Sequence, residues 1–415
     1  MKTKNSPFNA NTFQEIWKKH FFKNKQIKRF QFIEGTSFYK SKLPALFFNI
    51  GKNLTKGNYY KIHNHKDFEN KTFVIYDVLT DTEQTVHNLP KNLKILKSVQ
   101  YPGFLIHLNK FKSIDDYLLN TFSKNTRMKM RKFNKRLDTC FDISTKMFFG
   151  DIDKKQYDDL FDSFLELLQK KFSDKQISYN NLEPSEWNFY KEVAYPLILE
   201  KKASLFVVYD NQVPIAITYN YHTENTLIDA ITVFDVDYSK FNMGYVNNLK
   251  LISWCFDNQV QTLDFSKGYF DYKKRMSTLE YNFEYHIIYD INSIVSKSIG
   301  FAYYAFFELK AYMRKKGLDV KFHKFTYFLK NKKQANTQNL NAKTTNLNNL
   351  SDFKDLVKID IKKDTNYNFL IKHVNNFLYL NIKSYLDINV FKLKNQEDTY
   401  VISSDSSAQQ IKFMK

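Results

Sequence analysis

The segment 263–275, LDFSKGYFDYKKR, brings a carboxylate, a phenol and several cations together in a short stretch of sequence. Asp264 stands at the end of a strand-like run, Gly268 follows it, and Tyr272-Lys273 come next. At such a strand end a carboxylate can act as a general base, a tyrosine hydroxyl can donate a proton, and a lysine can hold an anion. The alternative is structural: Asp264 caps the following turn and Lys273 is a solvated surface lysine.

A second candidate site lies in 236–250, VDYSKFNMGYVNNLK, where a polar loop leads directly into a helical pattern. The first amides of a helix have no intrahelical partner and lie at the positive end of its dipole, so they can bind a pyrophosphate. The alternative is an ordinary loop in which Ser239 or Asn242 caps the helix. The candidate residues for binding a donor are Ser239, Lys240, Asn242, Gly244 and Tyr245.

The segment 121–138 is strongly basic, with seven Lys or Arg residues and one acid. At about 100° per residue, one face of a helix, away from its apolar stripe, carries Lys124, Arg127, Arg131 and Lys135. This face suits a polyphosphate, the backbone of tRNA or an anionic lipid, although a solvated face is the alternative. Arg127 and Arg131 therefore join Lys273 as candidate clamps for a substrate or a phosphate.

Histidine and cysteine usage suggests neither a metal site nor a disulfide framework. His63 and His65 could supply two ligands, but no second pair at metal-binding spacing is nearby, and no metal is expected. Cys140 and Cys255 are the two cysteines of the chain and fit a reducing compartment. No signal peptide and no apolar run of about 18 residues is found. We therefore expect a cytoplasmic protein, which leaves peripheral contact with a membrane open.

The charge of the chain concerns its partners more than its fold. Sixty-three Lys and Arg residues against 43 acidic ones give a net charge of +20 over 415 residues. RNA, an anionic membrane surface, an acidic carrier protein or a phosphorylated cofactor would each suit this charge, whereas DNA is not an expected partner. A basic surface without a bound partner is the alternative.

The periodicity of apolar residues predicts an α+β protein. Strands are expected at 44–50, 71–79, 95–108, 204–210, 213–222, 226–235, 260–265 and 280–289. Helices are expected at 114–141, 153–172, 185–200, 244–256, 270–277 and 293–316. Asn-rich sequence from 331 is typical of a flexible linker, and the tail alternates as a small β-rich unit would.

The order of these motifs resembles a known family. Pro214-Ile215-Ala216 on a strand, Gly244 before a helix, and then Asp264-Phe265, Gly268 and Tyr272-Lys273 resemble the GNAT acetyltransferase domain of the CelD-like branch, which is related to the Fem-type peptidoglycan aminoacyltransferases. The basic helix upstream looks like the family's Arg-rich helix. The resemblance covers about residues 95–280.

The resemblance implies an α+β GNAT fold, with two tandem GNAT-like halves, mixed sheets and a small β-rich C-terminal appendage. The expected domains are a degenerate GNAT-like half at 1–112, a GNAT acyltransferase domain at 113–330, an Asn-rich linker at 331–353 and the appendage at 354–415.

The resemblance also implies an N-acyltransferase, in which an amine attacks a thioester. A backbone amide of the strand at 226–235 would stabilise the oxyanion, Asp264 would orient or deprotonate the amine, and Tyr272 would protonate the leaving group. Acetyl-CoA or another acyl-CoA is the expected donor, and the acceptor is an amine such as that of a sugar or cell-wall precursor.

Departures from the family pattern keep other functions open. Ser266 stands where glycine is common, Met243 stands where proline is common, and the usual acyl-CoA loop of GNAT enzymes is absent. An acyl-carrier protein or aminoacyl-tRNA therefore remains an alternative donor. A non-catalytic GNAT-like module that binds an anionic polymer or lipid is the third hypothesis.

Overall fold

Strands from distant parts of the chain form one continuous sheet. The computed structural model describes residues 6–23, 26–80, 89–175, 180–317, 341–347, 355–394, 396 and 398–414. Within them, a 12-stranded sheet has the order β1-β2-β3-β5-β12-β6-β11-β10-β9-β8-β7, and β4 pairs with β2. The strands are β1 (Lys28–Phe30), β2 (Ile33–Lys40), β3 (Leu46–Asn49), β4 (Lys61–Ile62), β5 (Thr72–Leu79), β6 (Leu93–His107), β7 (Ile143–Phe148), β8 (Ala203–Asp210), β9 (Val213–His222), β10 (Thr226–Phe234), β11 (Thr262–Lys267) and β12 (Leu279–Asp290).

The long strands β6 and β12 join the two halves of this sheet. β12 pairs antiparallel with β5 and β6, and β6 also pairs with β11. β12 therefore lies among the N-terminal strands, although it follows all the strands of the other half in sequence. The chain therefore returns at β12 to the half of the sheet that precedes the predicted boundary near residue 112.

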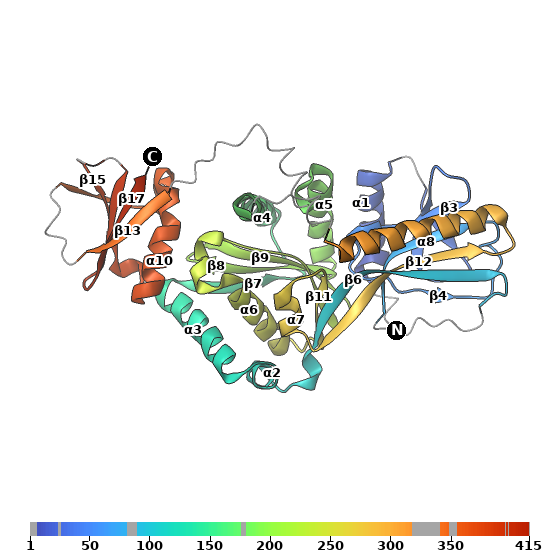
Figure 1. Cartoon of the computed structure of the whole chain (residues 1–415), viewed down its shortest axis with the longest axis horizontal. Helices are drawn as coiled ribbons and strands as arrows, with labels where there is room; N and C mark the ends of the chain where they lie inside the picture. The colour runs from blue at the N-terminus through green and yellow to red at the C-terminus, as the bar shows by residue number, and fades with distance from the viewer. Residues whose placement is uncertain are drawn as a thin grey trace.

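Helices cover both faces of the sheet (Figure 1). One face carries α1 (Asn11–Phe21), α4 (Lys154–Lys175), α5 (Pro184–Leu199) and α8 (Ile294–Lys315). The other face carries α2 (Ile114–Thr121), α3 (Lys124–Cys140), α6 (Met243–Asp257) and α7 (Asp271–Met276). Because both faces are covered, β8 and β9 bury almost every side chain and read as apolar runs.

The range 114–141, predicted as one helix, forms the two helices α2 and α3. Ser123 caps α3, since its hydroxyl accepts a hydrogen bond from the amide of Thr126. The guanidinium of Arg127 donates to the carbonyl of Phe122, a residue that belongs to neither helix. These local hydrogen bonds turn the chain between α2 and α3.

A separate five-stranded antiparallel sheet lies at the C-terminal end, in the order β13-β17-β16-β15-β14. It consists of β13 (Asn341–Leu347), β14 (Leu356–Ile359), β15 (Asn389–Leu393), β16 (Thr399–Ser403) and β17 (Ala408–Met414), with the helix α10 (Ile371–Asn381). Residues 341–347, which composition placed in the linker, pair with β17, and the rest of that linker lies outside the described residues. The tail was predicted to be β-rich, but α10 is a helix because Val374, Phe377 and Leu378 are buried at helical spacing.

The C-terminal unit packs against the basic helix α3 and the short 3₁₀ helix η5 (Val236–Phe241). Arg136 donates to the carbonyl of Tyr379 at 2.9 Å, and its guanidinium lies 4.5 Å from the Tyr379 ring centroid. Asn375 donates to the carbonyl of Asp237 at 3.2 Å. Part of the basic helix is therefore used in an internal contact. Across the described residues, no helix has the length and apolarity needed to cross a membrane.

Candidate functional site

The parallel strands β10 and β11 pair only where they begin. Their register comprises Thr226 with Thr262, Leu227 with Leu263 and Ile228 with Asp264. Past Ile228 the pairing of β10 with β9 shifts register between Asp229 and Ile231, which makes Ala230 the extra residue of a bulge. Among the described residues the two strands share no further register pairs. The open edge of β10 therefore presents backbone groups that a ligand could use.

A pocket of about 260 Å³ lies at the C-terminal end of β10, where α6 begins. Asn242 precedes the helix in a left-handed conformation (φ 53°), and its carbonyl accepts from the amide of Tyr245 at 2.9 Å. The first turn of α6 thus lines the pocket, and binding of a donor there stays a prediction. The lining residues are Lys171, Thr232, Phe234, Ser239, Asn242, Met243, Gly244, Tyr245, Asn248 and Tyr272.

Two lining residues explain the shape and charge of this pocket. A Cβ at Gly244 would lie 3.1 Å from a ring carbon of Phe234, so glycine lets the helix start approach that ring closely. Lys171 of α4 places its Nζ 3.4 Å from the carbonyl oxygen of Thr232 and 4.5 Å from the centroid of the Phe234 ring. Sequence reasoning missed Lys171, because nothing distinguishes it from the other lysines of its helix.

A strip of buried polar side chains lies between β9, β10 and α6. Thr232 donates to the carboxylate of Asp229 at 2.7 Å, and Asn247 donates to the hydroxyl of Thr218 at 3.0 Å. The side-chain oxygens of Asn247 and Asn248 accept no hydrogen bond from the described residues. A buried acceptor left in this state costs about 1–3 kcal/mol, so such groups indicate a place for water or for a polar ligand.

Lys273 is buried at the end of β11 instead of being solvated. Its Nζ donates to the carbonyl of Phe265 at 2.6 Å and to that of Lys267 at 3.1 Å. Burial lowers the pKa of Lys273 to about 8, and the negative charges of Asp229 and Asp264 oppose that shift. Burial also raises the pKa of Asp229, while the nearby Lys273 charge acts in the opposite direction. Two acids and a lysine therefore share the region where the strands diverge.

Asp264 points to the opposite face of the sheet from Tyr272. Its neighbours Leu263 and Phe265 pack in the cluster that contains α6, and successive side chains of a strand alternate between faces. The Asp264 carboxylate, in a residue only 4% exposed, accepts from the Tyr281 hydroxyl at 2.7 Å and from a backbone amide two residues later at 2.6 Å. The two predicted catalytic residues are thus separated by the sheet, with the divergent strands between them.

The N-terminal half contributes Lys56 to the Asp264 side. A small cavity of about 30 Å³ is lined by Lys56, Gly57, Ile228 and Asp264, among others. Lys56 is 9% exposed, and its Nζ forms no hydrogen bond or ion pair with any residue that the structure describes. Burial lowers the pKa of Lys56 to about 8. Sequence analysis missed this lysine, since the local sequence TKGN carries no recognisable motif.

The loop that carries Lys56 is held firmly. The hydroxyl of Thr55 donates to the carboxylate of Asp77 at 2.9 Å, and the amide of Asn58 donates to the Asp77 carbonyl at 2.7 Å. Gly57 has a φ of 150°, and a Cβ there would lie 2.7 Å from the Leu79 side chain. Lys56 is therefore positioned by the fold and does not reach the cavity by chance rotation of a surface loop.

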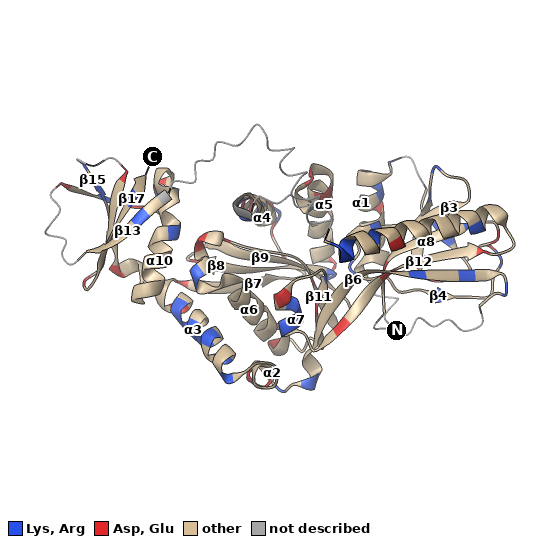
Figure 2. Ribbon diagram, in the orientation of Figure 1, with Lys and Arg blue, Asp and Glu red and all other residues tan. Residues whose placement is uncertain are grey.

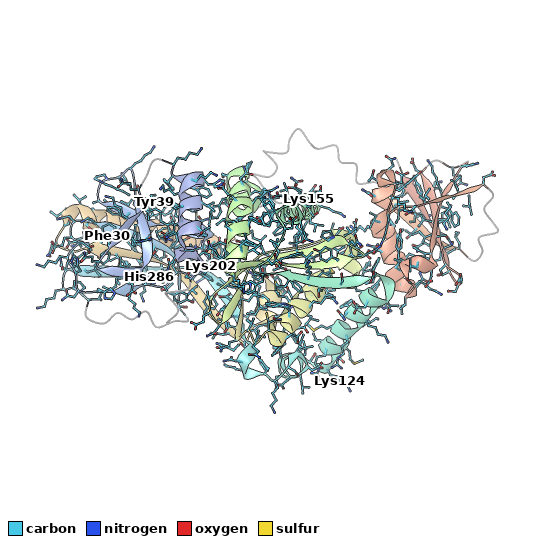
Figure 3. The ribbon with its side chains drawn as sticks, turned by 180° about the vertical axis from the view of Figure 1, so that it is seen from behind. Phe30, Tyr39, Lys124, Lys155, Lys202 and His286 are labelled. Atoms are coloured by element: carbon cyan, nitrogen blue, oxygen red, sulfur yellow. The ribbon has the colours of Figure 1, made fainter. Side chains whose placement is uncertain are left out.

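The remaining candidate residues lie outside the pocket at α6. Arg127 bonds the backbone between α2 and α3, and Arg131 lies 3.4 Å from Asp115 as an exposed ion pair. In Figure 3, Lys124 marks the start of this helix at the edge of the molecule. Lys240 is exposed beside the pocket without lining it. The structure therefore does not bring Arg127, Arg131 or Lys240 to the site of Tyr272.

The histidine pair has local partners. The Nε2 atom of His63 lies 3.1 Å from Oε2 of Glu34, and the Nδ1 atom of His65 lies 3.1 Å from Oδ1 of Asp67. Within the described ranges, no group of three or more His, Cys, Asp or Glu side chains is arranged to hold a metal ion.

Comparison with known proteins identifies the part of the chain that contains the pocket. Residues 124–274 match the family model described as the acetyltransferase (GNAT) domain. This segment is similar to a GNAT domain. It spans the basic helix α3, the meander β8–β10, the start of α6 and the Asp264–Lys273 segment, so the predicted GNAT resemblance is confirmed there. Membership of the CelD-like branch stays a prediction, and no curated protein matches the sequence.

Several solved structures resemble the chain at low sequence identity. FemX is 12% identical over 68% of this chain and 93% of its own, with a TM-score of 0.47. The C-terminal domain of a putative lysylphosphatidylglycerol synthetase from Agrobacterium fabrum is 9% identical over 69% and 88%, with a TM-score of 0.43. A tandem GNAT protein from the clavulanic acid biosynthesis pathway is 6% identical over 60% and 77%, with a TM-score of 0.32. The GNAT domain, the large mixed sheet and the separate C-terminal sheet confirm the predicted fold class.

Proposed function

We propose that the chain is an N-acyltransferase whose donor binds in the pocket at the start of α6. One observation carries the proposal: a single pocket in the GNAT domain gathers Ser239, Asn242, Gly244 and Tyr245 with Tyr272. The amides of Met243 and Gly244 in the first helical turn and the Lys171 ammonium would hold anionic groups of the donor. An acyl-CoA fits this chemistry, since its phosphates are anionic and its reactive group is a thioester.

The reaction would take place between β10 and β11. An acceptor amine attacks the thioester carbonyl, and a backbone amide at the open edge of β10 near Ala230 stabilises the resulting oxyanion. Collapse of the tetrahedral intermediate breaks the carbon–sulfur bond, and the Tyr272 hydroxyl protonates the departing thiolate. The amine nitrogen loses one proton to Asp264 or to water, and a proton from water restores the Tyr272 hydroxyl, so the amide and the free thiol form with no net change in protons.

The acceptor would approach from the Asp264 face. Asp264 is proposed to orient the amine or take its proton, and Lys56 to bind an adjacent polar or anionic group of the acceptor. Lys273, bonded to two carbonyls of β11, would stabilise the end of that strand and balance the charges of Asp229 and Asp264. The acceptor is proposed to be an amine such as that of a sugar or cell-wall precursor.

A ligand screen on the full chain tests this proposal. Thermal unfolding would be followed with acyl-CoA thioesters, acyl-carrier protein and charged tRNA, because a ligand that binds only the folded state raises the midpoint by mass action. A rise with an acyl-CoA, abolished by Gly244→Val, is the expected result. If no donor of these three classes raises the midpoint or is consumed, the non-catalytic module becomes the better description.

Transfer from aminoacyl-tRNA is the second candidate, because Lys and Arg residues recur along α3 (Figure 2). The exposed residues are Lys124, Lys129, Arg131, Lys132 and Lys135. Binding of tRNA through these residues would weaken steeply with salt, and Arg131→Gln with Lys135→Gln would reduce the slope. A salt slope that these substitutions leave unchanged would exclude α3 as the tRNA contact.

A further inference from the structure

The helix α8 carries a stripe of large apolar side chains on its outer surface. Ile294 is 83% exposed, Leu309 is 56% exposed and Phe306 is 55% exposed. Val295, Phe301, Tyr312 and Met313 of the same helix are also exposed. Soluble monomers rarely expose a contiguous apolar surface of this kind without a function for it.

The stripe is distinct from the face that holds the helix on the sheet. Phe307 stacks on Tyr285 with ring centroids 3.8 Å apart, and Gly300 packs closely on Tyr289. At about 100° per residue these inner positions lie opposite an arc that runs through the exposed apolar residues. The helix is therefore apolar on both sides, and the fold uses only one of them.

Cations flank the exposed stripe. From 294 to 316 the chain carries five Lys or Arg residues and one acid, Glu308. On the helical projection, Lys297 and Lys315 fall together at one edge of the apolar arc, and Lys316 follows the end of the helix. Glu308 lies at the same edge, so cations outnumber the single acid there. An apolar stripe bordered by lysines is complementary to a surface of anionic headgroups over acyl chains.

We infer that α8 docks the protein on an anionic phospholipid surface, lying in the plane of the interface. Its apolar stripe would enter the boundary between headgroups and acyl chains, while the lysines contact lipid phosphates. This surface is distinct from the proposed transferase site, because none of the described residues of α8 lines the pocket at α6 or the cavity beside Asp264.

A second copy of this chain fits the stripe less well. In a two-fold antiparallel pairing of α8 helices centred on Phe306, Lys297 of one copy would face Lys315 of the other. Like charges facing each other destabilise such a pair, whereas an anionic surface neutralises both lysines.

The test measures partition of the full chain onto vesicles by sedimentation. Phosphatidylglycerol–phosphatidylcholine vesicles would be compared with pure phosphatidylcholine vesicles at low and high salt. The double variant Phe306→Gln, Leu309→Gln should bind the anionic vesicles about tenfold more weakly or worse, since it removes apolar groups from the interface. Its thermal midpoint should match that of the wild type, because both side chains are exposed.

A matched control changes two exposed leucines outside α8. Leu380 is 62% exposed and Leu386 is 90% exposed, both in the C-terminal unit. The variant Leu380→Gln, Leu386→Gln should bind anionic vesicles as the wild type does. Wild-type protein that does not sediment with anionic vesicles would overturn the inference. So would a dimer in solution that the α8 variant dissociates without any change in vesicle binding. Loss of vesicle binding with unchanged donor turnover in solution would separate this surface from the transferase site.

Discussion

Lys267 of β11 forms an ion pair with Asp77 of β5, and the Asp77 side chain is completely buried. Asp77 also holds the loop that carries Lys56, and Lys267 donates to the carbonyl of Asn53 at 3.1 Å. One carboxylate therefore connects a strand of the GNAT domain with the loop that the N-terminal half inserts beside Asp264. Residues of both halves therefore line the candidate site.

The first prediction concerns this ion pair. Asp77→Ala leaves Lys267 largely buried without its counter-charge, and breaking a buried pair in this way costs about 3–5 kcal/mol. Denaturant unfolding of the full chain should show a loss of that size. Glu15→Ala is the control, because the Lys18–Glu15 pair is exposed and such pairs contribute at most about 1 kcal/mol. Equal losses in the two variants would show that Asp77 is no more important than a surface charge.

Much of the fold follows from the sequence, because local periodicity reflects local packing. The strands predicted at 204–210, 213–222 and 226–235 are confirmed as β8, β9 and β10. The two residues between β8 and β9, Asn211 and Gln212, have positive φ, at 58° and 116°. The position of β12 could not be predicted, since pairing with β5 and β6 depends on contacts between segments far apart in sequence. The helix α10 was missed because its apolar residues also fit an alternating pattern.

The candidate site was predicted unevenly for the same reason. Residues of the α6 loop are close in sequence, and the structure gathers most of them in one pocket. Lys56 and Lys171 reach the site from other elements, and their sequences show no spacing that marks them. Asp264 and Tyr272 were expected together, but strand alternation sends Asp264 to the opposite face.

The second prediction concerns Gly244. In Gly244→Ala the new methyl carbon would lie 3.1 Å from the Phe234 ring and narrow the start of α6. Donor affinity should fall about tenfold or more, while stability should stay the same or rise by up to about 1 kcal/mol, because alanine favours helices. Titration calorimetry with the donor found in the ligand screen measures the first effect, and thermal unfolding measures the second. Ser253→Ala, on the same helix but outside the pocket, should leave donor affinity unchanged.

The third prediction concerns the pH dependence of stability. Burial lowers the pKa of Lys56 from 10.5 to about 8, so between these values the unfolded chain binds a proton that the folded chain does not. Folding free energy therefore becomes more favourable as pH rises through this window, by at most about 3 kcal/mol for this residue. Lys56→Met should remove that gain, which is measured as the difference between wild-type and variant unfolding curves across the window. If the free energies of unfolding of wild type and Lys56→Met differed by the same amount at all pH values, burial would not disfavour the charged form of Lys56.

The last prediction separates the two faces of the sheet. Tyr272→Phe should lower turnover about 10²-fold with little change in acceptor KM, because the hydroxyl acts only as the thiolate leaves. Asp264→Asn should lower turnover and raise the KM for the acceptor amine. Donor binding, measured by calorimetry, should stay at the wild-type value. Both changes preserve side-chain volume, and comparison with Tyr281→Phe controls for loss of the hydrogen bond to Asp264.

Since Asp264 and Tyr272 lie on opposite faces, each substitution should affect the substrate on its own side. If Asp264→Asn weakens donor binding as strongly as acceptor binding, or if turnover survives undiminished, the proposed approach of the acceptor from the Asp264 face is wrong.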